Sequence, residues 1–272
     1  MLMNQNPRLA YPPLTYVLAQ IKISPIWNIE SWVPKLQEAI RKDFPYSNES
    51  QVETIVANSL EANPGAKVDL KKIWHFADKS KTSGILLDKD AVTIHTTHYE
   101  TFGELLHKFI TVLVKFHKEL NITICTRIGL RYVNLIRENP HKYIHKGLLG
   151  FPLSGKEKFL NKYASSTETI QQTSFGFLKI KTIFGENENE TVAEIPKFIP
   201  TELIYPASFL LHKKLDVKKS IKNYVVLDID HFSQENFDFS VKNIEKMLNN
   251  FHELVYTTFR YAITEQAYKE WS

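Results

Sequence analysis

The stretch Thr101–Ile136 constrains the fold more than any other part of the chain, because it predicts a long amphipathic helix followed directly by a long strand. Thr101 and Glu104 have the spacing of a capping box, in which each side chain bonds the backbone N–H of the other residue. The helix runs about 20 residues, or about 30 Å at 1.5 Å per residue, and ends at Asn121. Its apolar residues recur every three or four positions and share one face. They are Phe102, Leu105, Leu106, Phe109, Val112, Leu113, Phe116 and Leu120.

The strand Ile122–Ile136 is the longest β-favouring run in the sequence. Side chains alternate between the two faces of a strand, so Arg127 and Arg131 share a face with Gly129, and Asn134 lies on the other. Apolar residues occur on both faces, which is typical of a central strand. A glycine inside such a run indicates either a bulge or a close approach of another group to the backbone.

Two interpretations of the polar residues in this strand remain open. Arg127, Arg131 and Asn134 are candidates for binding an anion or an acidic partner, because guanidinium groups suit carboxylate and phosphate. Alternatively, the arginines form salt bridges within the sheet, with Asp228 and Asp230 as partners, since charged pairs on strands are ordinary.

The rest of the first half predicts a strand at Thr15–Ile23 and a helix from a Ser31 cap to Phe44. The cap is placed at Ser31 because Pro34 is tolerated only in the first turn of a helix. Asp88–Asp90 is predicted to be a hairpin turn. The predicted strands between the two helices are Gln51–Ser59, Lys71–Ala77, Gly84–Leu87 and Ala91–Thr97.

In the second half, residues 137–170 are expected to form loops with short helical pieces. Strands are predicted at Thr173–Phe184, Thr191–Phe198 and Tyr224–Asp230, and a final helix from Ser240 to near Trp271. Strands clustered between helices indicate an α+β fold with mostly antiparallel sheet, packed by long amphipathic helices. Two strand-rich halves, 1–136 and 137–272, are each closed by a long helix, and form either two domains or one continuous domain.

The composition indicates the cellular compartment of the protein more clearly than its function. The 272 residues are 43% hydrophobic, 24% charged and carry a net charge of +4, which is typical of a globular chain and permits a nucleic-acid partner without indicating one. The single cysteine, Cys125, fits a reducing compartment. The N-terminus has no signal-peptide pattern, and the apolar run Phe109–Val114 is far shorter than a membrane span. We therefore expect a soluble cytoplasmic protein with no membrane partner.

The sequence contains only weak candidates for metal-binding and catalytic motifs. With one cysteine, a zinc site built on several cysteines is excluded. The pairs His95/His98 and His141/His145 have ligand-like spacings, but fit ordinary loop histidines better. Asp228 and Asp230 share a strand face and are weak magnesium candidates that would need a third acid. No nucleophile motif and no Gly-rich phosphate loop occurs, so no cofactor and no catalytic residue is predicted.

A lysine-rich segment is the main candidate for contacting nucleic acid. It either forms a solvated surface or binds phosphates, and its aromatic neighbours flank the lysines rather than alternate with them. The lysines are Lys213, Lys214, Lys218, Lys219 and Lys222.

Several phrases of the sequence resemble a sporadically distributed bacterial family of hypothetical proteins of about this length. They are Pro12-Pro13, Tyr99 with Phe102, Arg127-Ile-Gly-Leu-Arg-Tyr-Val-Asn134, Leu227-Asp-Ile-Asp230, and a C-terminal helix with His252, Phe259, Ile263-Thr264 and Trp271. The resemblance covers nearly the whole chain, and the arginine–glycine–asparagine strand is its most specific piece. The family has no established activity, so the resemblance implies a prokaryotic cytoplasmic protein. Sporadic occurrence is typical of mobile elements and defence islands.

These observations predict a non-enzymatic protein that acts through contacts with another protein. An accessory or inhibitory member of a toxin–antitoxin or phage-defence operon fits the resemblance, and a homo-oligomer is compatible with it. The first alternative is a nucleic-acid-binding or nucleic-acid-processing protein that uses the lysine-rich segment. The second alternative is a binder of a small anionic ligand at Arg127 and Arg131.

Overall fold

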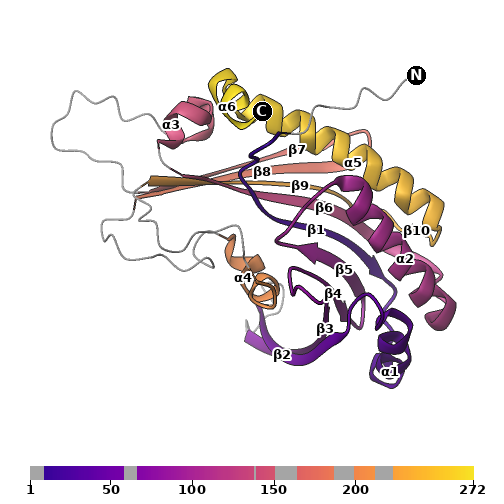
Figure 1. Ribbon diagram of the computed structural model, residues 1–272. Coiled ribbons are helices and arrows are strands. Elements are labelled where there is room, and N and C mark those ends of the chain that lie inside the picture. The colour runs from indigo at the N-terminus through magenta and orange to yellow at the C-terminus, as the bar shows by residue number, and fades with distance from the viewer. Residues whose placement is uncertain (1–8, 58–65, 138, 151–163, 187–198, 212–222) are drawn as a thin grey trace.

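The computed structural model describes residues 9–57, 66–137, 139–150, 164–186, 199–211 and 223–272 (Figure 1). The strands are β1 (Leu14–Ile23), β2 (Tyr46–Ala57), β3 (Ala66–Ala77), β4 (Ser83–Asp88), β5 (Ala91–Thr96), β6 (Ile124–Arg137), β7 (Ala164–Thr173), β8 (Gly176–Glu186), β9 (Asn223–Ser233) and β10 (Phe237–Asp238). The helices are α1 (Ile29–Ile40), α2 (Phe102–Leu120), α3 (Pro140–Tyr143), α4 (Thr201–Ser208), α5 (Val241–Ala262) and α6 (Glu265–Trp271), with a 3-10 turn at Lys146–Leu148.

All the strands belong to one antiparallel sheet of ten strands. Its order is β2-β3-β4-β5-β1-β6-β9-β8-β7, and β10 pairs with β6 beside this path. The α+β fold with an antiparallel sheet is therefore confirmed. β6 lies at the centre, paired with β1 from the first half of the chain and with β9 from the second. The sheet thus runs through both halves.

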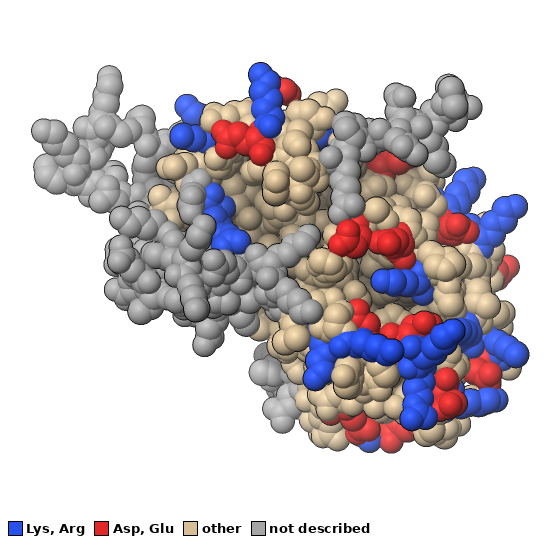
Figure 2. All heavy atoms as spheres, viewed as in Figure 1, with Lys and Arg blue, Asp and Glu red and all other residues tan. Residues whose placement is uncertain are grey.

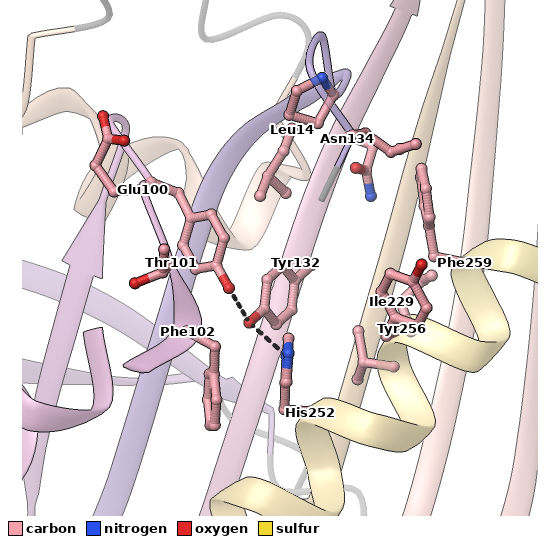
Figure 3. Close-up of a pocket in the computed structure, with 14 residues that line it drawn as sticks. Leu14, Glu100, Thr101, Phe102, Tyr132, Asn134, Ile229, His252, Tyr256 and Phe259 are labelled. Carbon is pink, nitrogen blue, oxygen red and sulfur yellow. Dashed lines mark hydrogen bonds between the residues drawn. The ribbon is translucent and has the colours of Figure 1, made fainter. Parts of the chain in front are cut away.

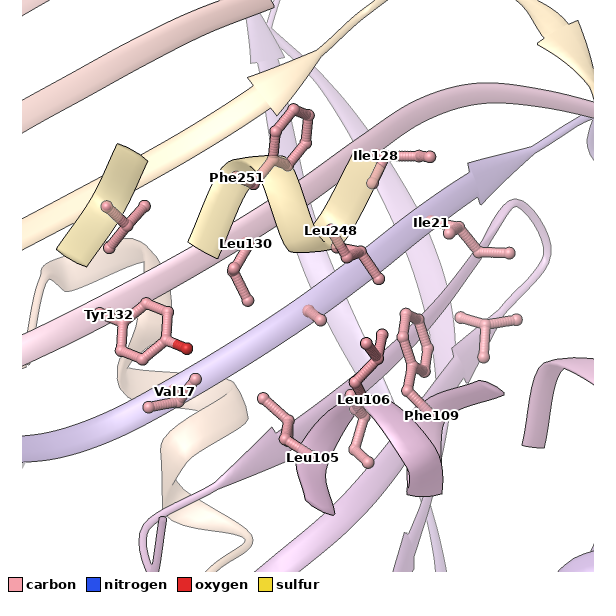
Figure 4. Packing of buried hydrophobic residues seen from close by; sticks show 14 of the residues in the cluster. Val17, Ile21, Leu105, Leu106, Phe109, Ile128, Leu130, Tyr132, Leu248 and Phe251 are labelled. Carbon is pink, nitrogen blue, oxygen red and sulfur yellow. The ribbon is translucent and has the colours of Figure 1, made fainter. Parts of the chain in front are cut away.

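The long helices cover one face of the sheet and α4 lies against the other (Figure 1). α1, α2 and α5 bury a large core that includes Phe109 of α2, Leu130 of β6 and Phe251 of α5 (Figure 4). On the opposite face, α4 covers a smaller apolar cluster that includes Val133 of β6 and Leu203. Within the described residues, no helix is both long and apolar enough to cross a membrane.

The predicted succession of helix and strand is confirmed, although β6 begins at Ile124 rather than Ile122 and one of the two capping-box bonds is found. The Thr101 side chain accepts a hydrogen bond from the backbone N–H of Glu104, and Asn121 ends α2 in a left-handed conformation. The apolar face of α2 is buried, with Phe109 fully inaccessible to solvent. Cys125 of β6 is also buried, and burial raises the pKa of its thiol. The hairpin turn Asp88–Asp90 is found as predicted, joining β4 to β5.

The expected bulge at Gly129 is wrong, and the alternative of close approach is right. The register irregularities of β6 against β1 lie at Thr15 and Thr126, to either side of Gly129. The guanidinium of Arg127 lies directly over Gly129, where a Cβ atom would come within 2.5 Å of Arg127 Nη1. Glycine at this position leaves room for the arginine.

Several predicted boundaries in the first half are wrong. α1 begins at Ile29, not after Ser31, and Ser31 Oγ donates instead to the carbonyl of Asn28 at 2.9 Å. The proline at position 34 therefore lies inside the helix rather than in its first turn. β2 and β3 each extend to twelve residues, because they pair with one another along their full length.

In the second half, the prediction of loops up to residue 170 is wrong for β7. β7 is an edge strand with both faces largely exposed, so its sequence lacks the apolar alternation that would identify a strand. The predicted final helix is broken: Ile263 is extended, and Thr264 caps α6 by accepting from the N–H of Ala267. The predicted strand Thr191–Phe198 lies outside the described residues.

Candidate functional site

The two arginines of β6 lie on the face of the sheet that carries α4, as the alternation predicts. Arg131 makes a two-pronged contact with Asp228: Nε donates to Oδ1 at 2.8 Å and Nη2 donates to Oδ2 at 2.6 Å. Nη2 also donates to Glu202 Oε1 of α4 at 2.6 Å. Arg131 and Asp228 are 7% and 1% exposed, so this pair is buried.

Arg127 is held by a second acidic partner. Its Nη2 lies 3.5 Å from Asp230 Oδ2, its Nη1 donates to Gln20 Oε1 at 3.2 Å, and its guanidinium packs over the ring of Phe232. Burial raises the pKa of Asp230, and the charges of Arg127 and Arg131 oppose that rise. The two arginines therefore each have a carboxylate partner on β9.

The pairing of both arginines argues against anion binding by this cluster. Arg131 is bonded to Asp228 and Glu202, and Arg127 lies beside Asp230, so both guanidinium groups already have carboxylate partners. Burial lowers the pKa of Arg131, but the hydrogen bonds and charge of Asp228, with a hydrogen bond from Glu202, raise it above its usual value. Burial raises the pKa of Glu202, but the hydrogen bond and charge of Arg131 lower it below its usual value. The arrangement is that of the salt-bridge interpretation. Among the described residues, no group of three His, Cys, Asp or Glu side chains is placed to hold a metal ion.

The other predicted site residues are dispersed. Asn134 lies on the opposite face of the sheet from the arginines and donates to the carbonyl of Leu227 at 3.2 Å. His95 is buried beside the hydroxyl of Tyr16 at 2.8 Å, and His98 lies 2.8 Å from Glu100. His141 packs against the ring of Phe184. The candidate lysines Lys213, Lys214, Lys218, Lys219 and Lys222 lie outside the described residues.

A further candidate site is a cavity of about 280 Å³ on the helix-covered face, next to Asn134 (Figure 3). It lies between the sheet, the N-terminal end of α2 and the C-terminal half of α5. The lining residues come from the N-terminal segment, the loop before α2, β6, β9 and α5, and most are apolar or aromatic. They are Leu9, Pro12, Leu14, Tyr99, Glu100, Thr101, Phe102, Tyr132, Asn134, Ile229, His252, Val255, Tyr256 and Phe259.

A short hydrogen-bonded chain forms the polar wall of this cavity (Figure 3). The hydroxyl of Tyr132 lies 3.0 Å from Nδ1 of His252 and 3.1 Å from the hydroxyl of Tyr99. Burial lowers the pKa of His252 to about 4, so its imidazole is neutral at pH 7. A neutral imidazole donates at one nitrogen and accepts at the other, so in the tautomer with the proton on Nε2, Tyr132 donates to His252 and Tyr99 donates to Tyr132.

The same geometry opposes a catalytic role for His252. A general base works best when its pKa lies near the operating pH, and a pKa of about 4 makes this imidazole a weak base. The ring is also fixed by stacking on Phe102, with ring centroids 4.1 Å apart and planes 7° from parallel. Burial raises the pKa of Tyr132 well above its usual value, so its hydroxyl stays protonated. The chain of groups is suited to holding a ligand in one orientation.

Charged side chains of both signs are interspersed over the part of the surface where α1 and α2 lie (Figure 2). The lining of the cavity differs from that surface in charge. Among its described lining residues Glu100 is the one ionised side chain, and none is a lysine or arginine. An anionic ligand would therefore be buried there without a cationic partner, which is unfavourable.

The sequence did not identify this cavity as a site, although Tyr99, Phe102, Asn134, His252 and Phe259 all occur in the phrases that carry the resemblance. No spacing rule connects residues that come from separate parts of the chain. Comparison with known proteins adds no assignment: no protein-family model, no curated protein and no solved structure matches the chain. The functional argument therefore rests on geometry.

Proposed function

We propose that this protein is a non-enzymatic binding protein that takes a small, largely apolar molecule into the cavity beside Tyr132 and His252. The observation that carries the proposal is a concave, mostly apolar space with a few convergent polar groups, which is the usual form of a small-molecule site. The apolar walls supply affinity, and the chain Tyr99–Tyr132–His252 supplies orientation.

Binding of an uncharged fluorescent probe tests this proposal. N-phenyl-1-naphthylamine is uncharged at pH 7, and its fluorescence should rise on transfer from water into the cavity. Val255 of α5 is 3% exposed and lines the cavity, so Val255→Phe should fill part of the space and weaken binding about tenfold or more.

The matched control is Val114→Phe, the same substitution on the exposed side of α2, where the valine is 50% exposed. This variant should bind the probe like the parent. Thermal unfolding of both variants shows whether they fold. Equal probe binding by parent and folded Val255→Phe protein would contradict the proposal.

A second candidate function is the protein–protein contact predicted from the sequence. Three large apolar side chains are exposed at the β7–β8 hairpin: Ile170, Phe175 and Phe177 are 57%, 40% and 38% exposed. Exposed apolar residues gathered in one place favour a contact with another protein. Membership of a toxin–antitoxin or phage-defence operon, and a nucleic-acid partner at the lysine-rich segment, stay predictions from the sequence.

Photo-crosslinking in the native host tests this second function. A benzophenone amino acid at position 175 should give a discrete crosslinked product, and Ile170→Glu should remove it, because a buried unpaired charge opposes docking. The control position is Tyr261 of α5, which is 78% exposed and lies on a different element. The same products from positions 175 and 261 would contradict a specific contact at the hairpin.

A further inference from the structure

A second hollow adjoins the cavity and differs from it in chemistry. It has a volume of about 240 Å³ and shares Tyr99, Glu100 and Thr101 with the cavity, so the loop before α2 borders both spaces. Its remaining walls are mostly polar and come from the β3–β4 turn, β5 and the first turns of α2. A ligand that occupies the apolar cavity and extends past Glu100 therefore enters a polar space.

The charge of this second hollow is negative. Its ionised lining residues are Asp78, Glu100, Glu104 and Lys108, a net charge of −2 with histidine counted as neutral. The N-terminus of α2 lies at the same boundary and acts as about half a positive charge, which is smaller than the acidic excess. A positive group on the ligand is therefore favoured here over a negative one.

Part of this acidic wall is held in place by the fold. Asp78 accepts hydrogen bonds from the backbone N–H groups of Thr82 and Ser83, at 2.9 and 3.3 Å, and from the hydroxyl of Ser80 at 2.9 Å. Hydrogen bonds from donors that carry no charge leave the negative charge of the carboxylate in place. Glu100 lies at the junction of the two spaces and contacts His98 at 2.8 Å.

We infer that the ligand is an amine with an apolar body, whose body lies in the cavity beside Tyr132 and His252 and whose ammonium group lies in the acidic hollow past Glu100. The inference rests on the proposed binding function and adds the chemical class of the ligand. Aromatic rings around the junction favour a cation as well, since a ring face attracts positive charge. Tyr99 lines both spaces, and Phe102 lines the cavity.

Three probes with the same body and different heads test the inference: 3-phenylpropylamine, 3-phenylpropanol and 3-phenylpropionate. Affinities are measured by calorimetry at pH 7 and low salt. The amine should bind roughly fivefold to tenfold more tightly than the alcohol, because partly exposed charges contribute modestly, and the carboxylate should bind weakest. Higher salt should reduce the preference for the amine.

A variant that removes one negative charge tests whether Glu100 causes the preference for the amine. Glu100→Gln keeps the side-chain shape and should weaken amine binding about twofold to fivefold while leaving alcohol binding unchanged. The control is Glu253→Gln, which removes an exposed carboxylate of α5 that lines neither space. It should change neither affinity.

Each of the following outcomes would overturn the inference, and each shows which part of it is wrong. Equal binding of the three probes means that the acidic hollow does not select the head group, and the proposed binding function stands. Tightest binding of the carboxylate means that the N-terminus of α2 dominates. If none of the three binds although N-phenyl-1-naphthylamine does, the amine class is wrong and the cavity still binds ligands. If the naphthylamine also fails, the proposed function itself is wrong.

Discussion

Individual residues on the two faces of β6 have different roles because alternation separates them. Arg131 points toward α4 and is neutralised by Asp228 and Glu202, whereas Tyr132 points toward α5 and forms the polar wall of the cavity. The adjacent residues Arg131 and Tyr132 thus belong to a buried ion pair on one face of the sheet and to the cavity on the other. The ion pair holds β6, β9 and α4 together, so its removal should be visible in stability.

Arg131→Ala should lower the free energy of unfolding by about 3–5 kcal/mol, because it leaves Asp228 buried without its partner. Denaturant unfolding measures the change. Arg41, exposed and paired with Glu38 at 3.4 Å, is the control, and Arg41→Ala should cost less than about 1 kcal/mol. Adding Asp228→Asn to Arg131→Ala should recover part of the loss. An unchanged midpoint in Arg131→Ala would contradict a structural role for the pair.

Three buried histidines should make the fold sensitive to acid. Burial lowers the pKa of His75, His231 and His252 from 6.5 to about 4. Between these values the unfolded chain binds more protons, so stability is full above pH 6.5 and falls as the pH drops toward 4. Each histidine contributes a slope of about 1.4 kcal/mol per pH unit in that window. Unfolding at pH 7, 6 and 5 measures the slope.

His75→Phe provides the comparison for this pH dependence. His75 already stacks on Phe209, with ring centroids 4.5 Å apart, and its Nε2 has no hydrogen-bond partner among the described residues. A phenyl ring keeps the stacking and cannot be protonated. The variant should show a shallower loss of stability between pH 6.5 and 4, and an identical slope would mean that His75 does not titrate in this window.

Among the secondary-structure elements, α2 has two structural roles. Its buried face, centred on Phe109, packs across the sheet, and its first turn borders both the cavity and the acidic hollow. The packing of the helix thus positions Thr101 and Phe102 at the ligand site. A substitution that removes packing in the middle of α2 should therefore lower the free energy of unfolding. Its effect on ligand binding should be indirect.

Phe109→Ala should destabilise the protein by about 3–5 kcal/mol, because Phe109 is fully buried and its removal leaves a cavity in the core. The control on the same helix is Val114→Ala at a half-exposed position, which should change stability by about 0.5 kcal/mol or less. Chemical denaturation of the two variants beside the parent gives both values. A loss well under 3 kcal/mol at Phe109 would mean that the site repacks.

At the scale of the whole molecule, one sheet and one core span both halves of the chain. β6 pairs with β9 along ten positions, from Ile128 with Ser233 to Arg137 with Tyr224. The large apolar core combines α2 from the first half with α5 from the second. Separation of the halves would expose the β6 edge and the apolar faces of both helices.

The fragments 1–136 and 137–272, each produced alone, should not fold stably, because each lacks half of the shared core and leaves a central strand edge unpaired. Amide dispersion in proton NMR spectra is the measurement. Mixing the two fragments should restore dispersion if the β6–β9 pairing forms between chains. A folded, monomeric 1–136 fragment would contradict this prediction and indicate two independent domains.

The local features of the fold could be predicted from the residues alone. The capping box at Thr101, the apolar stripe of α2, the alternation in β6 and the turn at Asp88–Asp90 all follow from residues within a few positions of one another. The α+β class followed from their order. Short-range hydrogen bonds and periodic burial decide such features, so neighbouring residues suffice to predict them.

The remaining features depend on contacts between residues that are far apart in the chain. β7 forms because β8 supplies its partner, and polar residues suffice at an edge that buries little. Arg131 became an ion pair because the β6–β9 register places Asp230 opposite it and brings Asp228, the diagonal neighbour opposite Val133, within reach of its guanidinium. The cavity unites residues from the N-terminal segment to α5. Contacts between distant residues depend on strand order and register, which local patterns do not encode.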